Sequence, residues 1–350
     1  MIAVALSGGV DSAAAAICLH EKGEAIAGFT LYFGSGIPKT DQIGRAAGLC
    51  RFLNIPHHVL DVHEEFLAIK DYFCREYLAG RTPNPCAICN RDIKFGLFLK
   101  KALSLGADHI ATGHYVRKGV SQGRYYLAGA REAKSQEYFL GLLSQFSIER
   151  GIFPLGEMTR AEAERLVFDA GMEIPRAESS QDACFIGDEG YVSFIESYTG
   201  SKAVPGDILD IKSRVIGRHK GVLFYTVGQR KGLGIGSRRR LYVLSKNAEK
   251  NSITVGERHK GPFYGFTMQG INFMKAASMC GPMEARVKVR YRQEPELAVI
   301  HPTGVSDAVV DYQGVFAPGQ LAVFYDSDMA ILCAGIINLR TPDYPSDMLT

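Results

Sequence analysis

Along the first third of the chain, short apolar runs alternate with segments in which hydrophobic residues recur every three or four positions. The apolar runs predict strands, and the recurring pattern predicts amphipathic helices. We expect strands at residues 2–6, 25–33, 57–62 and 109–112, and helices at residues 13–22, 43–53, 64–78 and 91–105. This alternation favours an α/β fold with a doubly wound parallel sheet. Ligands of such sheets bind at the carboxyl ends of the strands, which here precede Ser7 and Gly113.

The pattern changes after residue 112. A hairpin is predicted over residues 115–130 and helices over 136–143 and 160–170. Beyond Gly200 the chain contains only short strand patterns separated by glycine and proline turns. We therefore expect an α/β domain up to about residue 200 and one or two small β domains after it, with a softer boundary near residue 265.

The composition is that of an ordinary globular protein. Hydrophobic residues make up 46% of the 350 residues and charged residues 22%, which is enough for two or three domains with cores of their own. The first residues run directly into a glycine-rich turn, without the basic start and cleavage site of a signal peptide. No apolar run approaches the roughly 20 residues of a membrane helix. We expect a cytoplasmic protein.

The turn after the first predicted strand, Ser7-Gly-Gly-Val-Asp-Ser12, has the composition of a phosphate-binding loop. It lacks the lysine of a Walker motif. Glycines and hydroxyls between a strand and a helix N-terminus nevertheless form a nest of backbone N–H groups suited to phosphate. The alternative is a tight turn in which glycine serves geometry alone. On these residues by themselves, both interpretations stay open.

Eight cysteines are too few for a disulfide framework in an intracellular chain of this length. Two of them, Cys86 and Cys89, follow two prolines, which predict a stiff loop rather than a helix over residues 81–90. A helix predicted from residue 91 places Cys89 near a helix N-terminus, whose dipole favours a thiolate. Five others fall in helical or strand-like apolar patterns, where we expect them to be buried and inert: Cys18, Cys50, Cys74, Cys280 and Cys333.

The remaining thiol, Cys184, lies in a predicted loop at residues 179–185. A structural zinc site needs four ligands, and the sequence has neither a second Cys-x-x-Cys pair nor a closely spaced histidine pair. A redox dithiol would be expected directly after a strand, and the spacing of Cys86 and Cys89 could also be accidental. Three thiolates could instead hold an iron–sulfur cluster with one iron left open. The spacing does not decide between these alternatives.

Basic residues gather in two segments. Residues 286–292 alternate Arg286, Lys288, Arg290 and Arg292 with apolar residues, which on a strand places four cations on one face. Because surfaces normally mix charges, and the net charge is only +3, these segments favour a polyanion over a merely solvated face. We expect nucleic acid. The other segment, residues 211–240, has nine basic residues and no acidic one: Lys212, Arg214, Arg218, Lys220, Arg230, Lys231, Arg238, Arg239 and Arg240.

With these features in place, the chain resembles the tRNA-specific 2-thiouridylases of the MnmA type, a family of PP-loop ATPases. The resemblance implies a PP-loop ATP-binding domain at residues 1–200, a small central tRNA-binding domain at 201–265 and a C-terminal tRNA-binding β-barrel at 266–350. The likeness runs nearly from end to end. The matching segments are Ser7-Gly-Gly-Val-Asp-Ser12, Gly80-Arg-Thr-Pro-Asn-Pro85, Cys89-Asn90, Ile93-Lys94-Phe95, Ala111-Thr-Gly-His-Tyr115, Ser180-Gln-Asp182, Cys184-Phe185, Gly228-Gln-Arg-Lys-Gly-Leu-Gly234, Arg290-Tyr-Arg-Gln293 and Pro318-Gly-Gln320.

The resemblance implies ATP-dependent sulfur transfer to carbon 2 of the wobble uridine in certain tRNAs. ATP, with Mg²⁺, would adenylate the uridine oxygen, and a sulfur nucleophile would then displace AMP. The family's catalytic cysteines fall on Cys89, which carries or delivers the sulfur, and on Cys184, which releases it by forming a disulfide. The base must leave the stack to react.

Other site residues are implied by position. The partners implied are tRNA and a sulfur donor, either a persulfide carrier or inorganic sulfide, without membrane or DNA. Asn84 falls beside the flipped base, and Pro85 is a further expected tRNA contact. ATP contacts fall on Ser7, Gly8, Gly9, Val10, Asp11, Ser12, Leu31 and Gly113. Contacts to tRNA fall on His114, Lys134, Ser135, Gln136, Arg290, Tyr291 and Gln320.

Two features depart from the family pattern. Residues 34–41 form a shorter segment that lacks the usual tryptophan and acidic residues. Cys86 stands where many members have aspartate. We hypothesise that Cys86, Cys89 and Cys184 ligate a [4Fe–4S] cluster whose fourth iron binds the transferred sulfur.

Two other functions compete with this interpretation. A small-molecule PP-loop ligase would need the ATP turn but neither the paired thiols nor the basic β domains. A non-catalytic RNA-binding iron–sulfur protein would need the thiols and the cations but no reaction.

Overall fold

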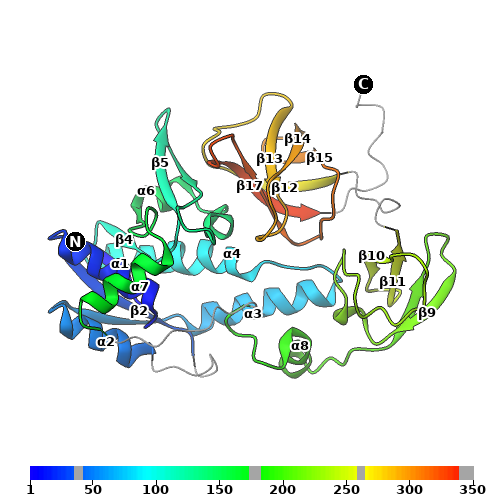
Figure 1. Ribbon diagram of the computed structural model, residues 1–350, viewed down its shortest axis with the longest axis horizontal. Helices are drawn as coiled ribbons and strands as arrows, with labels where there is room; N and C mark the ends of the chain where they lie inside the picture. Colours follow the sequence, from blue (N-terminus) through cyan, green and yellow to red (C-terminus); the bar gives the residue numbers. More distant parts are fainter. Residues whose placement is uncertain (35–41, 173–182, 258–264, 339–350) are drawn as a thin grey trace.

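The structure is a computed structural model that describes residues 1–34, 42–172, 183–257 and 265–338. An α/β unit comes first, a small four-stranded sheet follows, and a β-barrel comes last (Figure 1). Among the described residues, no helix is long and apolar enough to cross a membrane.

The first unit contains a five-stranded parallel sheet in the order β3-β2-β1-β4-β7, as the alternation of strands and helices predicted. The direction of winding reverses between β1 and β4, which is the point where doubly wound sheets bind ligands. The turns after these two strands therefore meet at one crevice. The strands are β1 (Ile2–Ala5), β2 (Ile26–Tyr32), β3 (His57–Asp61), β4 (His109–Ala111) and β7 (Gly151–Ile152).

Each face of this sheet carries its own core because alternate residues of a strand point to opposite sides. Ile2 and Val4 pack with α1, α2 and α7, whereas Ala3 and Phe29 pack with α3, α4 and α5. The helix after β1 begins at Val10, inside the glycine-rich motif and earlier than predicted. The helices are α1 (Val10–Glu21), α2 (Gln42–Phe52), α3 (His63–Leu78), α4 (Pro85–Cys89), α5 (Phe98–Ser104) and α7 (Arg160–Asp169).

Between β4 and α7 the chain forms the predicted hairpin, β5 (Arg117–Ser121) and β6 (Arg124–Ala128), then the 3₁₀ turn η2 (Glu137–Leu140) and α6 (Gln145–Arg150). The helix predicted over residues 136–143 is wrong beyond this single turn. The segment instead packs on the barrel, so closely that a Cβ on Gly141 would lie 2.9 Å from the Cβ of Ala334.

The helix α8 (Gly190–Thr199) leads to a four-stranded sheet with a small core of its own around Ile208, Val243 and Ile253. The barrel that follows is closed, which confirms the predicted fold class. The domain boundaries at residues 200 and 265 stay predictions. The four-stranded sheet contains β8 (Gly206–Leu209), β9 (Val215–His219), β10 (Tyr242–Asn247) and β11 (Ser252–Gly256), with the 3₁₀ turn η3 (Val222–Phe224). The barrel contains β12 (Phe266–Phe273), β13 (Met283–Lys288), β14 (Glu296–Pro302), β15 (Ala308–Asp311), β16 (Leu321–Tyr325) and β17 (Ile331–Asn338).

One of the five cysteines expected to be buried is not. Cys280 lies in the connection between β12 and β13 rather than in a strand, and it is exposed. Cys50, Cys74 and Cys333 are buried as predicted, and Cys18 is partly buried.

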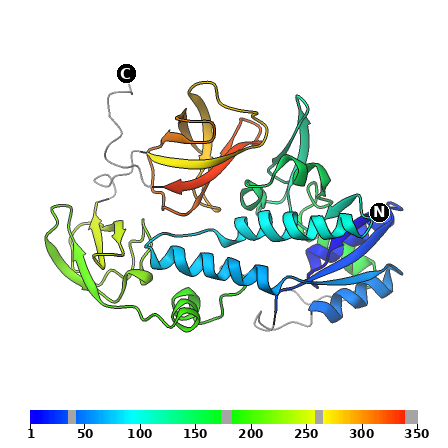
Figure 2. The same cartoon turned by 180° about the vertical axis from the view of Figure 1, so that it is seen from behind.

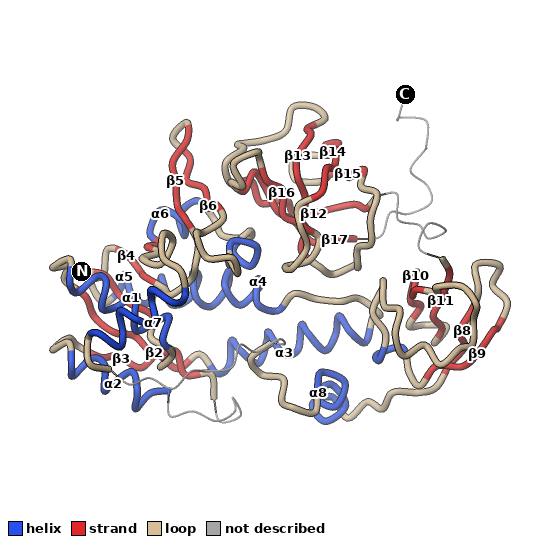
Figure 3. The backbone as a smooth tube through the Cα atoms, in the orientation of Figure 1, coloured by secondary structure: helices blue, strands red, loops and turns tan. Residues whose placement is uncertain are grey.

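The three units meet along two helices. In Figures 1 and 2, α3 and the helix that starts with α4 run side by side from the parallel sheet toward the four-stranded sheet, and the barrel lies over the start of α4. Figure 3 shows that a loop, not a helix, connects α3 to α4 beneath the barrel. This loop is residues 79–84.

A buried ion pair joins the barrel to the α/β unit. The Glu137 carboxylate in η2 is 1% exposed and accepts from the Lys288 ammonium of β13 at 3.1 Å. The hydroxyl of Tyr325, on β16, donates to the same carboxylate oxygen at 3.2 Å. Because charges buried at an interface need a partner, this cluster fixes how the barrel docks.

We expect Glu137→Gln to lower the free energy of unfolding by about 3 kcal/mol, because the Lys288 ammonium would stay buried without its counter-charge. Urea unfolding followed by far-UV circular dichroism measures the change. The matched control is Glu65→Gln, an exposed glutamate on α3, for which a change within about 0.5 kcal/mol is expected. Equal stability of the two variants would contradict the role given to the pair.

Candidate active site

The turn between β1 and α1 has the geometry of an anion site. Gly8 has a φ of +70°, a conformation that favours glycine. The Ser12 hydroxyl donates to the Gly9 carbonyl at 2.8 Å and accepts from the Ser7 N–H at 3.2 Å, which closes the turn. No side chain caps α1, so the N–H groups of its first turn remain available to a phosphate.

The loop after β4 lies directly on this turn. A Cβ on Gly113 would lie 2.6 Å from the Asp11 carbonyl oxygen and 2.8 Å from the Ser12 nitrogen, so no other residue fits without a shift. Two residues on, the Tyr115 hydroxyl donates to the Asp11 carboxylate at 2.8 Å. Burial and this carboxylate raise the pKa of Tyr115, which therefore stays a neutral donor. The arrangement fits the phosphates of ATP.

The predicted loop over residues 81–90 is correct for residues 81–84 and wrong from Pro85 on, because the part that carries Cys86 and Cys89 is helical. Pro85 is the first residue of α4, a position where the missing proline N–H is not needed. The Asn84 side chain caps this end by accepting from the Ala87 N–H at 3.1 Å. Beyond Cys89 the chain continues as a π-helix, η1 (Asn90–Leu97), and then as α5. We call residues 85–104 the thiol helix.

Cys89 therefore lies inside the thiol helix and not at a helix N-terminus, so the predicted dipole-stabilised thiolate was wrong. It is buried, and burial raises its pKa to about 12. Burial likewise raises the pKa of the partly buried Cys86 to about 11. Both thiols are neutral at physiological pH in this conformation.

Cys184 lies close enough to the thiol helix to add to the raised pKa of both Cys86 and Cys89. Its side chain is more exposed than that of Cys89, although burial still raises its pKa. Lys94, on the π-helix, opposes the effect of burial on the pKa of all three thiols, and it also helps to lower the pKa of His114. Analysis of the sequence did not single out Lys94 as a site residue, although it lies in the matched segment after Cys89.

The three thiols do not form a metal site in this arrangement. Among the described residues, no group of three or more histidine, cysteine, aspartate or glutamate side chains is placed to hold a metal ion. The hypothesis that Cys86, Cys89 and Cys184 ligate a [4Fe–4S] cluster thus has no support from this geometry. The matched segment Ser180-Gln-Asp182, just before Cys184, lies outside the described residues.

The barrel is hydrogen-bonded to the loop that precedes the thiol helix. The Thr82 N–H donates to the Pro318 carbonyl at 2.7 Å, and the Gln320 amide donates to the Pro83 carbonyl at 3.4 Å. Between them, a Cβ on Gly319 would meet Arg81 and Thr82 at 3.1–3.2 Å. Residues 318–320 and 81–83, far apart in sequence, form one contact. We call it the barrel clasp.

Comparisons with known proteins match every part of this architecture. Family models described as the tRNA methyl transferase HUP domain, the tRNA methyl transferase PRC-barrel domain and the aminomethyltransferase beta-barrel domain match residues 1–188, 192–257 and 263–337. The tRNA-specific 2-thiouridylase MnmA of Synechococcus sp. (strain JA-2-3B'a(2-13)) is 41% identical, covering 97% of this chain and 95% of the relative. The protein of the same name from Geotalea uraniireducens (strain Rf4) is also 41% identical, with 94% and 93% covered.

The chain belongs to the tRNA-specific 2-thiouridylase family. Among solved structures, the U34-tRNA thiolase NcsA from Methanococcus maripaludis with its [4Fe–4S] cluster is 18% identical, covering 57% of this chain and 64% of that one. Its TM-score of 0.34 is too low to support an argument.

The nucleic-acid contacts expected for this 2-thiouridylase family member cluster around η2. The Gln136 side chain accepts from the Tyr115 N–H at 2.9 Å, and the Ser135 hydroxyl accepts from the Ala130 N–H at 2.8 Å. The Tyr291 hydroxyl donates to the carbonyl of Lys134, which is itself exposed, at 3.1 Å. Two predicted contact segments, 134–136 and 290–291, are therefore neighbours in space.

The remaining expected positions lie beside these groups. His114 is partly buried, bonds Thr112 through its Nδ1 at 2.8 Å, and has a pKa held well below its usual range by burial. Asn84 and Pro85 are buried at the start of the thiol helix. Leu31 is buried in β2, opposite Leu60 of β3.

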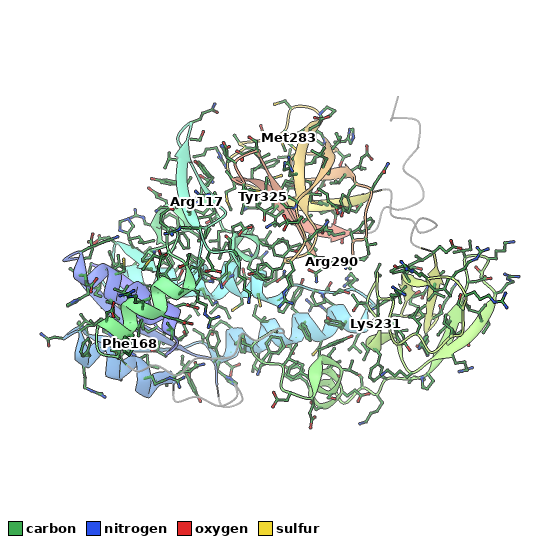
Figure 4. All side chains as sticks on the ribbon, viewed as in Figure 1. Arg117, Phe168, Lys231, Met283, Arg290 and Tyr325 are labelled. Carbon is green, nitrogen blue, oxygen red and sulfur yellow. The ribbon has the colours of Figure 1, made fainter. Side chains whose placement is uncertain are left out.

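The predicted row of four cations on one strand is only partly correct. Strand β13 ends at Lys288, whose ammonium pairs with Glu137, so Arg290 and Arg292 lie beyond it. Arg290 is labelled in Figure 4 at the side of the barrel that faces the helices, and it donates to the Val227 carbonyl at 3.1 Å.

The other basic segment, residues 211–240, remains largely exposed (Figure 4, around Lys231). Acidic residues from outside it pair with Arg214, Arg218 and Arg239. Four further cations of the segment form no ion pair with another described residue: Arg230, Lys231, Arg238 and Arg240.

The raised pKa of Cys89 predicts a slow, pH-dependent reaction with iodoacetamide. Since the thiolate is the reactive form, the difference in thiolate fraction makes alkylation at pH 8 more than about a thousandfold slower than for free cysteine, whose pKa is about 8.5. The rate should still rise above about pH 10, toward the pKa of about 12. Peptide mass spectrometry measures the rate, with exposed Cys280 as the internal reference. A rate that levels off near pH 9 would contradict the burial argument.

Proposed function

We propose that this protein transfers sulfur to carbon 2 of the wobble uridine of tRNA in an ATP-dependent reaction. What supports the proposal is that Cys184 lies close enough to Cys89 to add to its raised pKa, and that Lys94 lies close enough to these thiols and to His114 to lower their pKa. The match to relatives named tRNA-specific 2-thiouridylases covers nearly the whole length of both chains. The cytoplasmic location expected from the sequence stays a prediction.

In the first step, the uridine oxygen at carbon 2 attacks the α-phosphate of ATP. Pyrophosphate leaves, the proton on the neighbouring ring nitrogen is lost, and the oxygen becomes part of a good leaving group. The N–H groups at the start of α1 would bind the phosphates. Mg²⁺ would accompany them, and Asp11 is the carboxylate of this turn.

For the second step, we assign the roles of the two cysteines from their exposure to solvent. Exposed Cys184 accepts a sulfur atom from a persulfide donor, and the terminal sulfur of this persulfide attacks carbon 2 and expels AMP. Buried Cys89 then attacks the Cys184 sulfur, which leaves the transferred sulfur on the base as a thiocarbonyl and forms a Cys89–Cys184 disulfide. The two cysteines supply the two electrons, and an external thiol restores them. This reverses the order of roles expected from the sequence.

The nucleic-acid surface follows from the same arrangement. The anticodon loop would lie between η2, the barrel clasp and the thiol helix, where Lys134, Arg290 and Gln320 are found. The exposed cations of residues 211–240 would bind phosphates farther along the tRNA. The base would enter as a flipped nucleotide.

Cysteine variants test the reaction. We expect Cys89→Ser and Cys184→Ser each to lower 2-thiouridine formation by more than about a hundredfold, because each removes one sulfur of the disulfide that drives release. Pyrophosphate release in the presence of tRNA should continue, since the ATP site is intact. The readouts are nucleoside mass spectrometry of the tRNA and a pyrophosphate assay, with Cys280→Ser as the control.

The same experiment separates the competing functions. Wild-type pyrophosphate release that does not depend on RNA would favour a small-molecule ligase. Unchanged 2-thiouridine after Cys89→Ser would show that these thiols are not the catalytic ones. The persulfide route further requires that Cys86→Ser retain activity and that active protein contain no iron, whereas loss of bound iron together with activity in Cys86→Ser would support the cluster.

A further inference from the structure

Arg45, on α2, lies against the phosphate turn, and no residue that the structure describes pairs with its charge. An ideal Cβ placed on Gly8 would lie 3.2 Å from the Arg45 Nε, so the guanidinium borders the middle of the turn. This Nε is buried and has no hydrogen-bond acceptor. Neither a hydrogen bond nor an ion pair joins Arg45 to any other residue of the described part of the chain.

The position of Arg45 is imposed by the fold. The same Cβ on Gly8 would lie 3.0 Å from the Gln42 carbonyl oxygen, so the first turn of α2 is packed against the phosphate turn. Gln42 and Arg45, three residues apart, share one face of the helix. The guanidinium is thus held beside Gly8 by main-chain packing.

A buried N–H of a charged group that has no acceptor destabilises the fold. The acidic residue of the turn, Asp11, is not the acceptor of the Arg45 N–H, because its carboxylate accepts from Tyr115 on the other side. A guanidinium beside glycine backbone and uncapped helix N–H groups has the donor geometry that planar, bidentate phosphate recognition uses. The missing partner is an anion.

The strand order indicates which part of the nucleotide this anion is. Gly113 and His114, an expected tRNA contact, follow β4 on one side of β1, whereas Arg45 follows β2 on the opposite side. The α-phosphate must face the uridine, and therefore the β4 side. We propose that Arg45 binds the β- and γ-phosphates of ATP, the pair that leaves as pyrophosphate. This inference deepens the proposed function and rests on it for the identity of the nucleotide.

Equilibrium binding of AMP, ADP and ATP, measured by calorimetry without tRNA, tests the proposal. We expect Arg45→Met to weaken ATP and ADP binding about tenfold or more, the loss of one charged hydrogen bond, and to leave AMP binding within about twofold. Arg45→Lys should recover part of the loss because it keeps the charge. Arg51→Met, an exposed arginine in the last turn of α2, should match wild type.

Equal weakening of all three nucleotides, or unchanged ATP binding, would overturn the role of Arg45. Thermal unfolding of each variant separates this result from misfolding, and Arg45→Lys keeps the test valid if Arg45→Met does not fold. Wild-type protein that binds no ATP would overturn the proposed function itself. If the wild-type protein binds ATP and Arg45→Met keeps the same relative affinities for AMP, ADP and ATP, only this inference is overturned.

Discussion

The barrel clasp is the contact on which the geometry of the site depends. Residues 81–83 enter the thiol helix, and the barrel residues 318–320 bond their backbone from the far end of the chain. Position 319 favours glycine because its φ is +88°, and a Cβ there would also lie only 3.1–3.2 Å from Arg81 and Thr82. The clasp fixes the start of the thiol helix, and the core below the sheet fixes the rest of it through Ile93 and Phe98.

The contact between the barrel and the thiol helix links the expected tRNA-binding surface to the position of Cys89. The same barrel that would contact tRNA through Arg290 and Gln320 also sets where the helix with Cys89 begins. The buried Glu137–Lys288 pair anchors the barrel from a second direction. A tRNA bound across these surfaces would therefore meet the thiols at a fixed distance, which is the positioning that a two-step transfer on one base requires.

The surroundings of the thiols keep them neutral at rest, and a nearby cation favours their deprotonation. Burial keeps Cys89 neutral, and Lys94 is the cation that favours the anionic form of all three sulfurs. A persulfide formed on the exposed Cys184 can reach a donor, whereas Cys89 is shielded from external oxidants. The proposed order of roles therefore rests on the difference in solvent access between Cys184 and Cys89.

Periodicity and turn composition were enough to predict the parallel sheet and the phosphate turn, because both depend on local pattern. The helix predicted from residue 91 is present, but its start at Pro85 was missed because Pro85 was interpreted as a helix breaker, although proline is tolerated at a first helical position. The single turn at Glu137 and the end of β13 at Lys288 are joined by an ion pair between segments far apart in the sequence, which no local pattern contains. No sequence pattern marks Arg45 as a site residue, since Gly8 is its neighbour in space but not in sequence.

The central claim, that Cys184 carries the sulfur and Cys89 releases it, is tested most directly by following the sulfur through a single turnover. The protein is loaded with a persulfide donor, freed of excess donor and mixed with tRNA and ATP, and its peptides are analysed by mass spectrometry. The account predicts one added sulfur atom on the Cys184 peptide before the reaction and a Cys89–Cys184 disulfide, with thiolated tRNA, after it. Sulfur found on Cys89 before turnover, or thiolated tRNA formed without that disulfide, would contradict it.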